Sequence, residues 1–298
     1  MLALLLALAL DLCLGEPTPK LHPVVWMGRY LSLVKRHPAE PRTAFWRGLS
    51  LLLVGAGIVS ALAWGSVYLV GRLPGWLEPI LLAILLKPMF SLRALLQAGE
   101  EVRSALGAAD LNEARRLLSW HLVSRDTAHL SESEVAGAAV ESLAENFTDS
   151  VVAPLVYFAL LGLPGAALYR FVNTADAVLG YRTAELEYLG KSSARLDDAL
   201  NFIPARLSAA LLTLSLGLLG GSASRAHRAA ASARLPSPNA GWTMGAVAGG
   251  LGVRLDKRGV YVLNPSGRPA RPEDIRRVTQ VVVTATLLLL TALLGLGL

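Results

Sequence analysis

Long apolar stretches alternate with polar segments along this chain. Gly48 to Val70 and Val278 to Leu298 contain no acidic or basic residue over 23 and 21 positions. A helix needs about 20 apolar residues to cross a bilayer, so both stretches predict membrane spans. Leu73 to Trp76 (LPGW) predicts a tight turn with an interfacial tryptophan, after which Pro79 to Phe90 predicts the returning segment.

The pattern becomes polar with helical periodicity between residues 91 and 130. Leu and Ala recur there at intervals of three and four, which predicts a cytoplasmic or interfacial helical hairpin with Asp110 as the cap of its second helix. Ser131 and Glu134 have the order of a capping box and predict the start of a helix that runs towards Asp149. This helix leads straight into another apolar stretch.

That stretch, Val151 to Leu163, has 13 apolar residues and ends at a GLPG turn signal. It is too short to span a membrane alone. Joined to the preceding helix it crosses the membrane, whereas as a separate half-helix it is re-entrant and lines a cavity. The pattern leaves both possibilities open, and it leaves the side of residues 164–206 unassigned.

Composition places the chain among membrane proteins. It has 298 residues, of which 53% are hydrophobic and 17% charged, against roughly 45–50% and about 25% in soluble domains. Leu, Ala and Gly dominate over aromatic residues, which favours close helix packing over a β-barrel. We therefore predict an all-α, polytopic integral membrane bundle with re-entrant or broken helices, formed by residues 1–298 as a single membrane-embedded domain.

The basic residues indicate topology rather than nucleic-acid binding. The net charge is +6, but the bases lie in loops without an aromatic-interleaved platform. Residues 15–47 hold six bases against two acids, and residues 225–277 hold ten bases. By the positive-inside rule both segments are cytoplasmic, so we expect a multi-pass protein of the cytoplasmic membrane.

The first apolar segment and its cysteine exclude further classes. Met1 to Leu14 lacks a basic start and contains Asp11, so a retained helix is the better interpretation than a cleaved signal peptide. Cys13 is the only cysteine, which excludes an internal disulfide and argues against a cysteine-based metal site.

Three acids and an asparagine form the first candidate site. Glu141, Glu145 and Asp149 are four residues apart, so each step drifts only about 40° around a helix and the three share a face. Asn146 lies about 100° from Glu145 on the same turn. A solvated helix face is the simple alternative, but ionisable groups next to a lipid-depth segment usually line a cavity.

A second polar cluster lies between Tyr169 and Arg182. Asn173 and Asp176 share a helix face at a spacing of three. Arg170 and Arg182 flank them and have the guanidinium geometry that binds phosphate oxygens. An internal salt bridge from either arginine to Asp176 explains the same residues equally well.

A third cluster contains adjacent aspartates. Asp197 and Asn201 are four apart, Asp198 is adjacent, and Pro204 predicts a helix interruption before Arg206. Carboxylate and amide oxygens at this spacing suit Mg²⁺, with water and phosphate completing its coordination. Helix capping by one of the two aspartates is the alternative.

Other motifs carry less chemistry. The glycine-rich run at residues 235–252 contains no Gly-Lys-Ser/Thr, and helix packing through small residues explains it better than a phosphate loop. The five histidines show no zinc-ligand spacing. His22, in LHPVVWMGR, is the one histidine that stands out as a candidate, although an ordinary loop histidine is the better interpretation. The sequence lacks GxSxG and a dinucleotide fingerprint, so covalent serine catalysis and hydride transfer lose support.

Four motifs in order resemble one enzyme family. They are DLCLGEP…HPVVWMGR, AENFTDSVVAPLVYFALLGLPGAALYRFVNTADAVLGYR, LGKSSARLDDALNFIPARL and PSPNAGWTMGAVAGGLGVRL. From about Asp11 to Arg277 the chain is similar to the adenosylcobinamide-phosphate synthase family, integral membrane enzymes of cobalamin (vitamin B12) biosynthesis.

The resemblance implies a carbon–nitrogen ligase. Such an enzyme joins adenosylcobyric acid to (R)-1-amino-2-propanol or its O-phosphate through an amide bond, with ATP as co-substrate and Mg²⁺. Acidic residues and arginines are the equipment expected for activating a carboxylate. The implied catalytic residues are Glu141, Glu145, Asp149 and Asp198, and the implied metal ligands are Asp197, Asp198 and Glu145. The implied substrate-binding residues are Asn146, Asn173, Asp176, Asn201, Arg182 and Arg206, the two arginines towards phosphate.

Two other functions compete with the enzyme. A transporter would use the charged half-helices as a substrate path, but it should show repeated halves and the sequence has none. A non-catalytic anchor that gathers other membrane corrinoid enzymes needs no acids at helical spacing in three segments. We therefore expect corrinoid and aminopropanol substrates and the lipid bilayer as partners, with association with other corrinoid enzymes as a further possibility.

Overall fold

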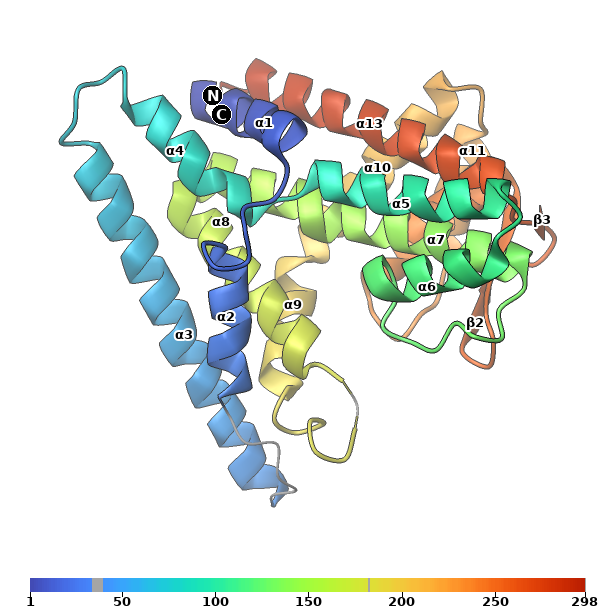
Figure 1. The fold of residues 1–298 in the computed structure, drawn as a ribbon, viewed down its shortest axis with the longest axis horizontal. Coiled ribbons are helices and arrows are strands. Elements are labelled where there is room, and N and C mark those ends of the chain that lie inside the picture. The colour runs from blue at the N-terminus through green and yellow to red at the C-terminus, as the bar shows by residue number, and fades with distance from the viewer. Residues whose placement is uncertain (34–39, 182, 298) are drawn as a thin grey trace. The chain divides into compact units, whose positions relative to one another are not determined.

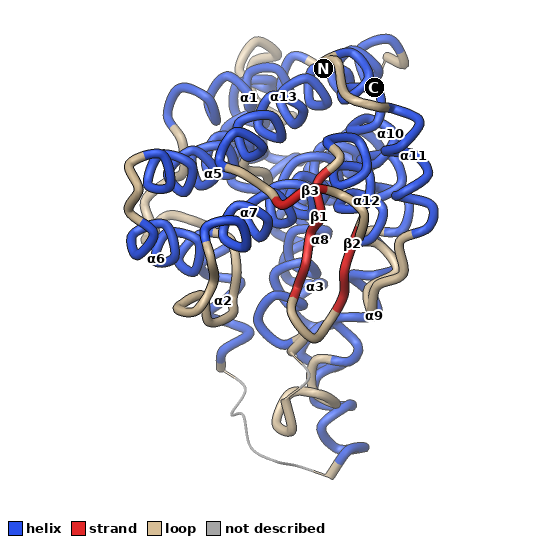
Figure 2. The backbone as a smooth tube through the Cα atoms, turned by 90° about the vertical axis from the view of Figure 1, so that its right-hand side faces the viewer, coloured by secondary structure: helices blue, strands red, loops and turns tan. Residues whose placement is uncertain are grey.

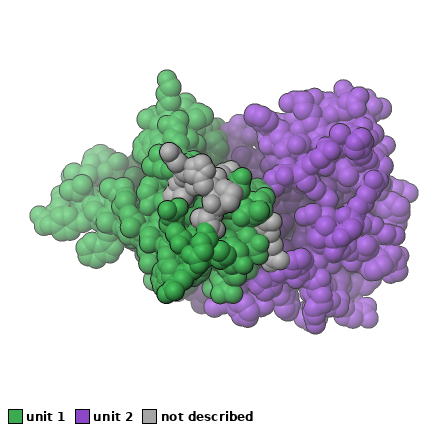
Figure 3. Space-filling model, turned by 90° about the horizontal axis from the view of Figure 1, so that it is seen from below, with its two compact units in different colours: residues 1–91, 153–201, 297–298 green, residues 92–152, 202–296 purple. Residues whose placement is uncertain are grey.

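The structure, a computed structural model, describes residues 1–33, 40–181 and 183–297. The chain divides into two compact units, and each is assembled from separate stretches of sequence (Figure 3). Unit 1 contains residues 1–91, 153–201 and 297–298, and unit 2 contains residues 92–152 and 202–296. The single domain expected from the sequence stays a prediction.

Unit 1 is entirely helical in its described part. Its elements are α1 (Leu2–Leu14), α2 (Pro23–Ser32), α3 (Pro41–Val70), α4 (Glu78–Leu86), the short 3₁₀ helix η1 (Lys87–Met89), α8 (Ala153–Leu179) and α9 (Lys191–Leu200). α1 packs on α4, and α3 packs on α8 and α9. Gly48 permits the approach of α3 to the chain before α9, because a Cβ there would lie 1.8 Å from the Leu189 carbonyl oxygen.

Unit 2 contains most of the remaining helices. They are α5 (Leu92–Gly107), α6 (Leu111–His121), α7 (Glu132–Phe147), the π-helix η2 (Thr148–Val152), α10 (Phe202–Leu218), α11 (Ala223–Ser232), α12 (Ala240–Leu251) and α13 (Pro272–Gly295). α5, α6 and α7 lie side by side (Figure 1). Two helices, α5 and α6, form where the hairpin was predicted, and Asp110 Oδ1 accepts from the Glu113 amide at 2.9 Å to cap α6. The cytoplasmic or interfacial location of this hairpin stays a prediction. The capping box of Ser131 and Glu134 at α7 is also confirmed.

A small sheet adds to the helical fold of unit 2. Its strands are β1 (Val253–Lys257), β2 (Tyr261–Leu263) and β3 (Arg268–Pro269), with β1 in the centre, antiparallel to β2 and parallel to β3 (Figure 2). The predicted cytoplasmic segment 225–277 thus contains this sheet together with α11 and α12. The glycines of α12 serve packing, as predicted, because a Cβ at Gly249 would lie 2.5 Å from the Arg225 carbonyl oxygen of α11.

Four helical stretches are long and apolar enough to cross a membrane: Pro41–Val70, Glu78–Gly107, Glu132–Leu179 and Pro272–Gly295. The bent pair of α9 and α10 makes a fifth if it counts as one span. The chain is therefore a multi-pass membrane protein of helical type. The apolar stretch after Val151 is joined to the preceding helix, with a break at Gly162, whose φ is +66°.

The prediction of a break at Pro204 is wrong in position. The helix ends at Leu200 and the next begins at Phe202, so the break lies at Asn201. Pro204 lies in the first turn of α10, where a missing backbone N–H removes no helical hydrogen bond.

Candidate functional site

The acids of α7 are not a uniform solvated face. Glu141 is only 6% exposed, whereas Glu145 is exposed and Asp149 is half-buried. Asp149 also lies in η2, where the wider π-helical turn shifts side chains relative to an α-helix. The solvated-face interpretation is therefore wrong at Glu141, which faces the interior of unit 2.

Glu141 has an incomplete set of partners. The Arg125 guanidinium lies 3.8 Å from Oε2, and Ser142 fixes the Arg125 segment by donating to the Leu122 carbonyl at 2.6 Å. Oε1 is buried and has no hydrogen-bond partner among the described residues. A buried acceptor without a donor is costly, so this oxygen is a candidate ligand-binding or proton-accepting atom.

Tyr261 of β2 adds a hydroxyl beside this carboxylate. Its hydroxyl interacts with Glu141 through hydrogen bonding and charge, is close enough to feel the charge of Glu145, and also contacts Met244 Sδ at 3.7 Å. Burial, together with the two negative charges, raises the pKa of Tyr261, so the phenol stays protonated at neutral pH. Sequence reasoning missed Arg125 and Tyr261, because only the tertiary fold brings them to α7.

Asn146 is the one predicted amide on α7. Its Nδ2 donates to the Ser142 carbonyl at 3.0 Å and to the Ser142 hydroxyl at 2.9 Å, one turn back in the same helix. The amide nitrogen is thus used locally, and its predicted contact with a corrinoid amide stays a prediction.

Three of the predicted residues in unit 1 form one hydrogen-bond network between α8 and α9. Asp197, only 9% exposed, accepts from Asn173 Nδ2 at 3.3 Å and from Asn201 Nδ2 at 3.1 Å. Arg170 extends it by donating to Asn173 Oδ1 at 3.4 Å. The spacing predicted that Asp197 and Asn201 share a helix face, and the packing of α8 on α9 adds Asn173 and Arg170 to them.

Two tyrosines of α8 complete this network and were missed by sequence reasoning. Tyr169, buried at 1% exposure, donates to Asn201 Oδ1 at 2.9 Å. Tyr157 stacks on it with ring centroids 5.2 Å apart and donates to the Leu200 carbonyl at 2.9 Å. This stacked pair and its two hydrogen bonds thus hold the C-terminal end of α9, up to Asn201, against α8. Both tyrosines stand in apolar stretches of the sequence, where a tyrosine is most simply explained as a packing residue.

The helix-capping alternative for the two adjacent aspartates is not realised. Asp197 and Asp198 lie within α9, whose N-cap is Gly190, so the helix-capping interpretation is wrong. Within the described part of the chain Asp176 makes no ion pair, and Arg182, its other predicted partner, lies outside the described residues. Asp176 and Asp198 instead lie close enough for their like charges to interact.

The three predicted metal ligands, Asp197, Asp198 and Glu145, do not come together as one cluster in the structure as described. In the described ranges, no three His, Cys, Asp or Glu side chains are placed to hold a metal ion. Glu145 belongs to unit 2 and both aspartates to unit 1, so their shared metal site stays a prediction. Two neighbouring carboxylates, Asp176 and Asp198, nevertheless suit Mg²⁺ in kind, because Mg²⁺ often takes one or two carboxylates and completes its shell with water and phosphate.

The two predicted phosphate-binding arginines have different outcomes. Arg206 of α10 lies over the rings of Phe202, 3.5 Å from the centroid, and Trp242, 5.0 Å from the centroid. It also donates to the Phe202 carbonyl at 2.6 Å and to Asn239 Oδ1 at 3.3 Å, so part of its donor set serves packing. Arg182 lies outside the described residues.

A charged cluster in unit 1 was not predicted. Lys87 Nζ lies 2.9 Å from Asp11 Oδ1 and 2.9 Å from Glu16 Oε1. Ser91 donates to the same Glu16 oxygen at 2.6 Å, and His22 Nε2 lies 2.9 Å from the other. His22 Nδ1 accepts from the Val24 amide and caps α2, so Nε2 carries the proton towards Glu16. His22 is therefore not the ordinary loop histidine that the sequence indicated.

The hydrogen bonds of this cluster also set its charge. Burial alone would raise the pKa of Glu16, but the bonds from His22, Ser91 and Lys87 and the Lys87 charge lower it to about 2. Lys87 and Asp11 are almost fully buried, with side chains 6% and 0% exposed. The cluster links α1, α2 and η1.

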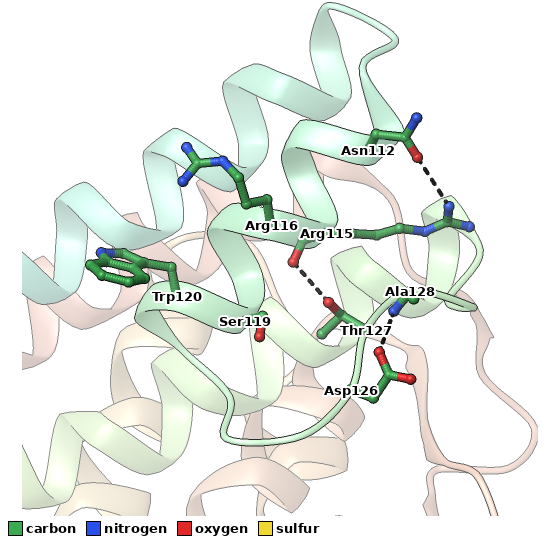
Figure 4. Close-up of a pocket in the computed structure, with 8 residues that line it drawn as sticks. All are labelled: Asn112, Arg115, Arg116, Ser119, Trp120, Asp126, Thr127 and Ala128. Atoms are coloured by element: carbon green, nitrogen blue, oxygen red, sulfur yellow. Dashed lines mark hydrogen bonds between the residues drawn. The ribbon is translucent and has the colours of Figure 1, made fainter.

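A pocket of about 480 Å³ lies on α6 and the following turn (Figure 4). Several of its polar groups already have partners: Thr127 donates to the Arg115 carbonyl at 2.9 Å, and Arg116 pairs with Glu113, outside the pocket, at 2.6 Å. Trp120 at its edge is 77% exposed. These contacts indicate a surface depression, and the predicted residues lie elsewhere.

Comparisons with known proteins agree with the sequence motifs. The family described as "CobD/Cbib protein" matches residues 4–289. The "Probable cobalamin biosynthesis protein CobD" of Methanothermobacter thermautotrophicus is 43% identical, over 96% of this chain and 93% of the relative. That of Thermococcus kodakarensis is 44% identical, over 98% and 95%. The "Cobalamin biosynthesis protein CobD" of Dehalococcoides mccartyi is 39% identical, over 92% and 90%.

No solved structure matches the chain. The family match covers nearly all of the described helices, and it includes both polar networks and the charged cluster around Lys87. With relatives above 30% identity over almost their whole length, the chain belongs to the CobD/CbiB protein family.

Proposed function

We propose that this protein acts in cobalamin biosynthesis as a ligase of the cytoplasmic membrane. It joins the free carboxylate of adenosylcobyric acid to (R)-1-amino-2-propanol or its O-phosphate as an amide. The observation that carries the proposal within the structure is Glu141, a buried carboxylate whose Oε1 has no hydrogen-bond partner among the described residues. The family membership supplies the corrinoid pathway.

Amide formation requires a group such as Glu141. The amine arrives as an ammonium ion, and it becomes a nucleophile only after losing a proton. A carboxylate with an open oxygen binds the ammonium and then accepts that proton. The Arg125 guanidinium lies 3.8 Å from this carboxylate, and the Tyr261 phenol is a nearby hydrogen-bond donor. Glu145, exposed on the next turn, adds negative charge that attracts the ammonium ion.

The unit 1 network has the chemistry to hold amides and phosphate-bound metal. Asp197 fixes the amides of Asn173 and Asn201, which orients them without using all their polar atoms. The rim of the corrinoid carries amide groups, for which asparagines are natural partners. Asp176 and Asp198 would take Mg²⁺ together with nucleotide phosphates.

ATP supplies the driving force in this proposal. The corrinoid carboxylate attacks the γ-phosphorus of ATP and releases ADP, which leaves an acyl phosphate. The amine then attacks the acyl carbon, loses its proton to a carboxylate such as Glu141, and expels inorganic phosphate. Each bond that forms is matched by one that breaks, and the proton leaves through the enzyme's base.

Growth rescue tests the reaction. A strain without its own synthase receives this gene under B12-dependent conditions with cobyric acid or cobinamide as the corrinoid. We expect growth on both, whereas the empty-vector strain grows on cobinamide alone. A gene that is expressed and inserted but gives no growth on cobyric acid would contradict the ligase and favour a transporter or an anchor.

Three conservative variants test the residues. Glu141→Gln, Glu145→Gln and Asp198→Asn keep size and remove charge, so membrane insertion should be unchanged. We expect at least a hundredfold loss of ligation for Glu141→Gln, in line with the 10²–10⁴-fold that a positioned acid or base contributes. Glu132→Gln, in the first turn of α7, is the matched control. Full activity in all three variants would remove this site assignment.

A further inference from the structure

A cationic pocket lies in unit 1, apart from the residues of the network around Asp197. It has a volume of about 310 Å³, and the first turns of α3 and α9 meet there. Of the six described residues that line it, three are cationic, two are aromatic and none is acidic: Pro41, Arg42, Phe45, Tyr188, Lys191 and Arg195. Its volume is in the range of small-ligand sites.

The three cations are not neutralised by the protein. Within the described ranges, neither Arg42 nor Lys191 nor Arg195 takes part in an ion pair. Lys191 Nζ lies 5.2 Å from the ring centroid of Tyr188, which holds the ammonium at the pocket wall. Lys191 and Arg195 are four residues apart on α9, a like-charge arrangement that destabilises a helix unless an anion lies between them.

The N-terminus of α9 adds to the positive field. Gly190 is its N-cap and supplies no side-chain hydrogen bond, so the first amide groups of the helix lack a protein cap. The Ser192 and Ser193 hydroxyls are buried and have no hydrogen-bond partner among the described residues. Gly190 is required here, because a Cβ would lie 1.9 Å from the Leu179 carbonyl oxygen.

The order Gly190, Lys191, Ser192 is that of the end of a phosphate-binding loop at a helix N-terminus. The glycine that begins the full motif is absent, since Glu185 stands at its position. The three residues thus share the physical features of such a loop without its complete signature: a close backbone approach, an ammonium group and a hydroxyl at uncapped helical amides. The glycine-rich run at residues 235–252 lacks this order.

We propose that this pocket binds a phosphate group, held by Arg42, Lys191 and Arg195 at the N-terminus of α9. Two guanidinium groups and one ammonium match the oxygens of a phosphate monoester or of a nucleotide's terminal phosphates. That the soluble ligand is the phosphorylated amine or ATP rests on the proposed function, whereas phosphate recognition itself does not. The headgroup of an anionic lipid presents the same phosphate group. A lipid is a possible source because α3, a candidate membrane span, begins at this pocket.

Binding to purified protein tests the proposal and separates the two sources. The full-length protein, in a phosphate-free maltoside detergent, is dialysed against radiolabelled ATP without Mg²⁺, with inorganic phosphate as competitor. In a second arm, nanodiscs of phosphatidylcholine with or without phosphatidylglycerol measure the lipid phosphate retained by the protein. The variants are Arg42→Gln, Lys191→Gln and Arg195→Gln, each alone and combined, and Arg195→Lys keeps the charge.

We expect each neutralising variant to weaken phosphate binding about tenfold, the effect of one charge-assisted hydrogen bond. Arg195→Lys should retain most of the binding. The matched control is Arg116→Gln, an exposed arginine paired with Glu113 on α6, and it should bind like the wild type. Loss of soluble binding assigns the pocket to a substrate, and loss of lipid retention alone assigns it to a headgroup.

The triple variant decides the proposal. If it binds ATP, inorganic phosphate and phosphatidylglycerol as the wild type does, the pocket does not recognise phosphate. The measurement is binding, so its result does not depend on ligation. If the triple variant no longer binds phosphate but still supports growth on cobyric acid, the pocket is a phosphate site that the proposed reaction does not use. Arg195→Lys guards against loss of binding through misfolding.

Discussion

Replacing Lys87 by Met is expected to destabilise the protein strongly, because this ammonium is the shared cation of a buried charged cluster in unit 1. The ammonium lies 2.9 Å from Asp11 and 2.9 Å from Glu16, and its side chain and that of Asp11 are 6% and 0% exposed. At this separation and an effective dielectric constant of about 20, each attraction is roughly 6 kcal/mol before desolvation. Breaking a buried pair from one side typically costs about 3–5 kcal/mol, because a charge stays buried without its partner.

The comparison of single and double variants isolates the pair. Asp11→Asn leaves Lys87 with Glu16, so it should cost less than Lys87→Met. The double variant Asp11→Asn with Lys87→Met should be more stable than the sum of the single effects by about 1 kcal/mol or more, because no charge is then stranded.

Unfolding in detergent, followed by tryptophan fluorescence against denaturant, gives the free energies. Lys20→Met, an exposed lysine nearby, is the control and should change the free energy of unfolding by less than about 0.5 kcal/mol. A Lys87→Met variant as stable as Lys20→Met would refute the argument that this cluster is a buried, stabilising network.

The remaining predictions concern packing and pH. Gly48→Ala should destabilise the folded protein by about 1–3 kcal/mol or more, because the new Cβ would lie 1.8 Å from a backbone carbonyl oxygen. Gly57→Ala on the same helix meets nothing within 4 Å and should leave the stability unchanged or raise it. Thermal unfolding of both variants checks this, and equal effects would contradict it. Because the pKa of Glu16 is about 2 in the fold against 4.5 ordinarily, its stabilisation is complete above pH 4.5 and is lost as the pH falls to about 2. Unfolding free energies measured across this window should fall more steeply for the wild type than for Glu16→Gln, and parallel curves would remove this role of Glu16.

Local patterns in the sequence were sufficient for the helices and for part of the site. The uncharged stretch Gly48 to Val70 lies within α3, and the capping residues Asp110 and Ser131 begin α6 and α7. The spacing of Asp197 and Asn201 placed both on one face of α9, where they bond to each other. These predictions succeeded because helical periodicity and capping depend on neighbours within about four residues.

The same patterns failed where a helix ends or where distant segments meet. The sequence favoured Pro204 as the break, but proline is tolerated in the first turn of a helix, and the break lies at Asn201. It treated His22 as an ordinary loop residue, although its ring caps α2 and bonds to Glu16. Capping geometry depends on side-chain directions that residue identity alone does not fix.

The sequence by itself determined the class of this protein, its helices and the acids and amides that carry its candidate chemistry. Hydrophobicity and residue type are properties of single residues and their near neighbours, so they can be recognised without the tertiary structure. Only the tertiary structure decided that Glu141 is buried beside Arg125 and Tyr261, and that Asp11 and Glu16 share Lys87. Burial and ion pairing depend on which distant segments pack together, and that is fixed by the whole set of contacts rather than by any one stretch of sequence.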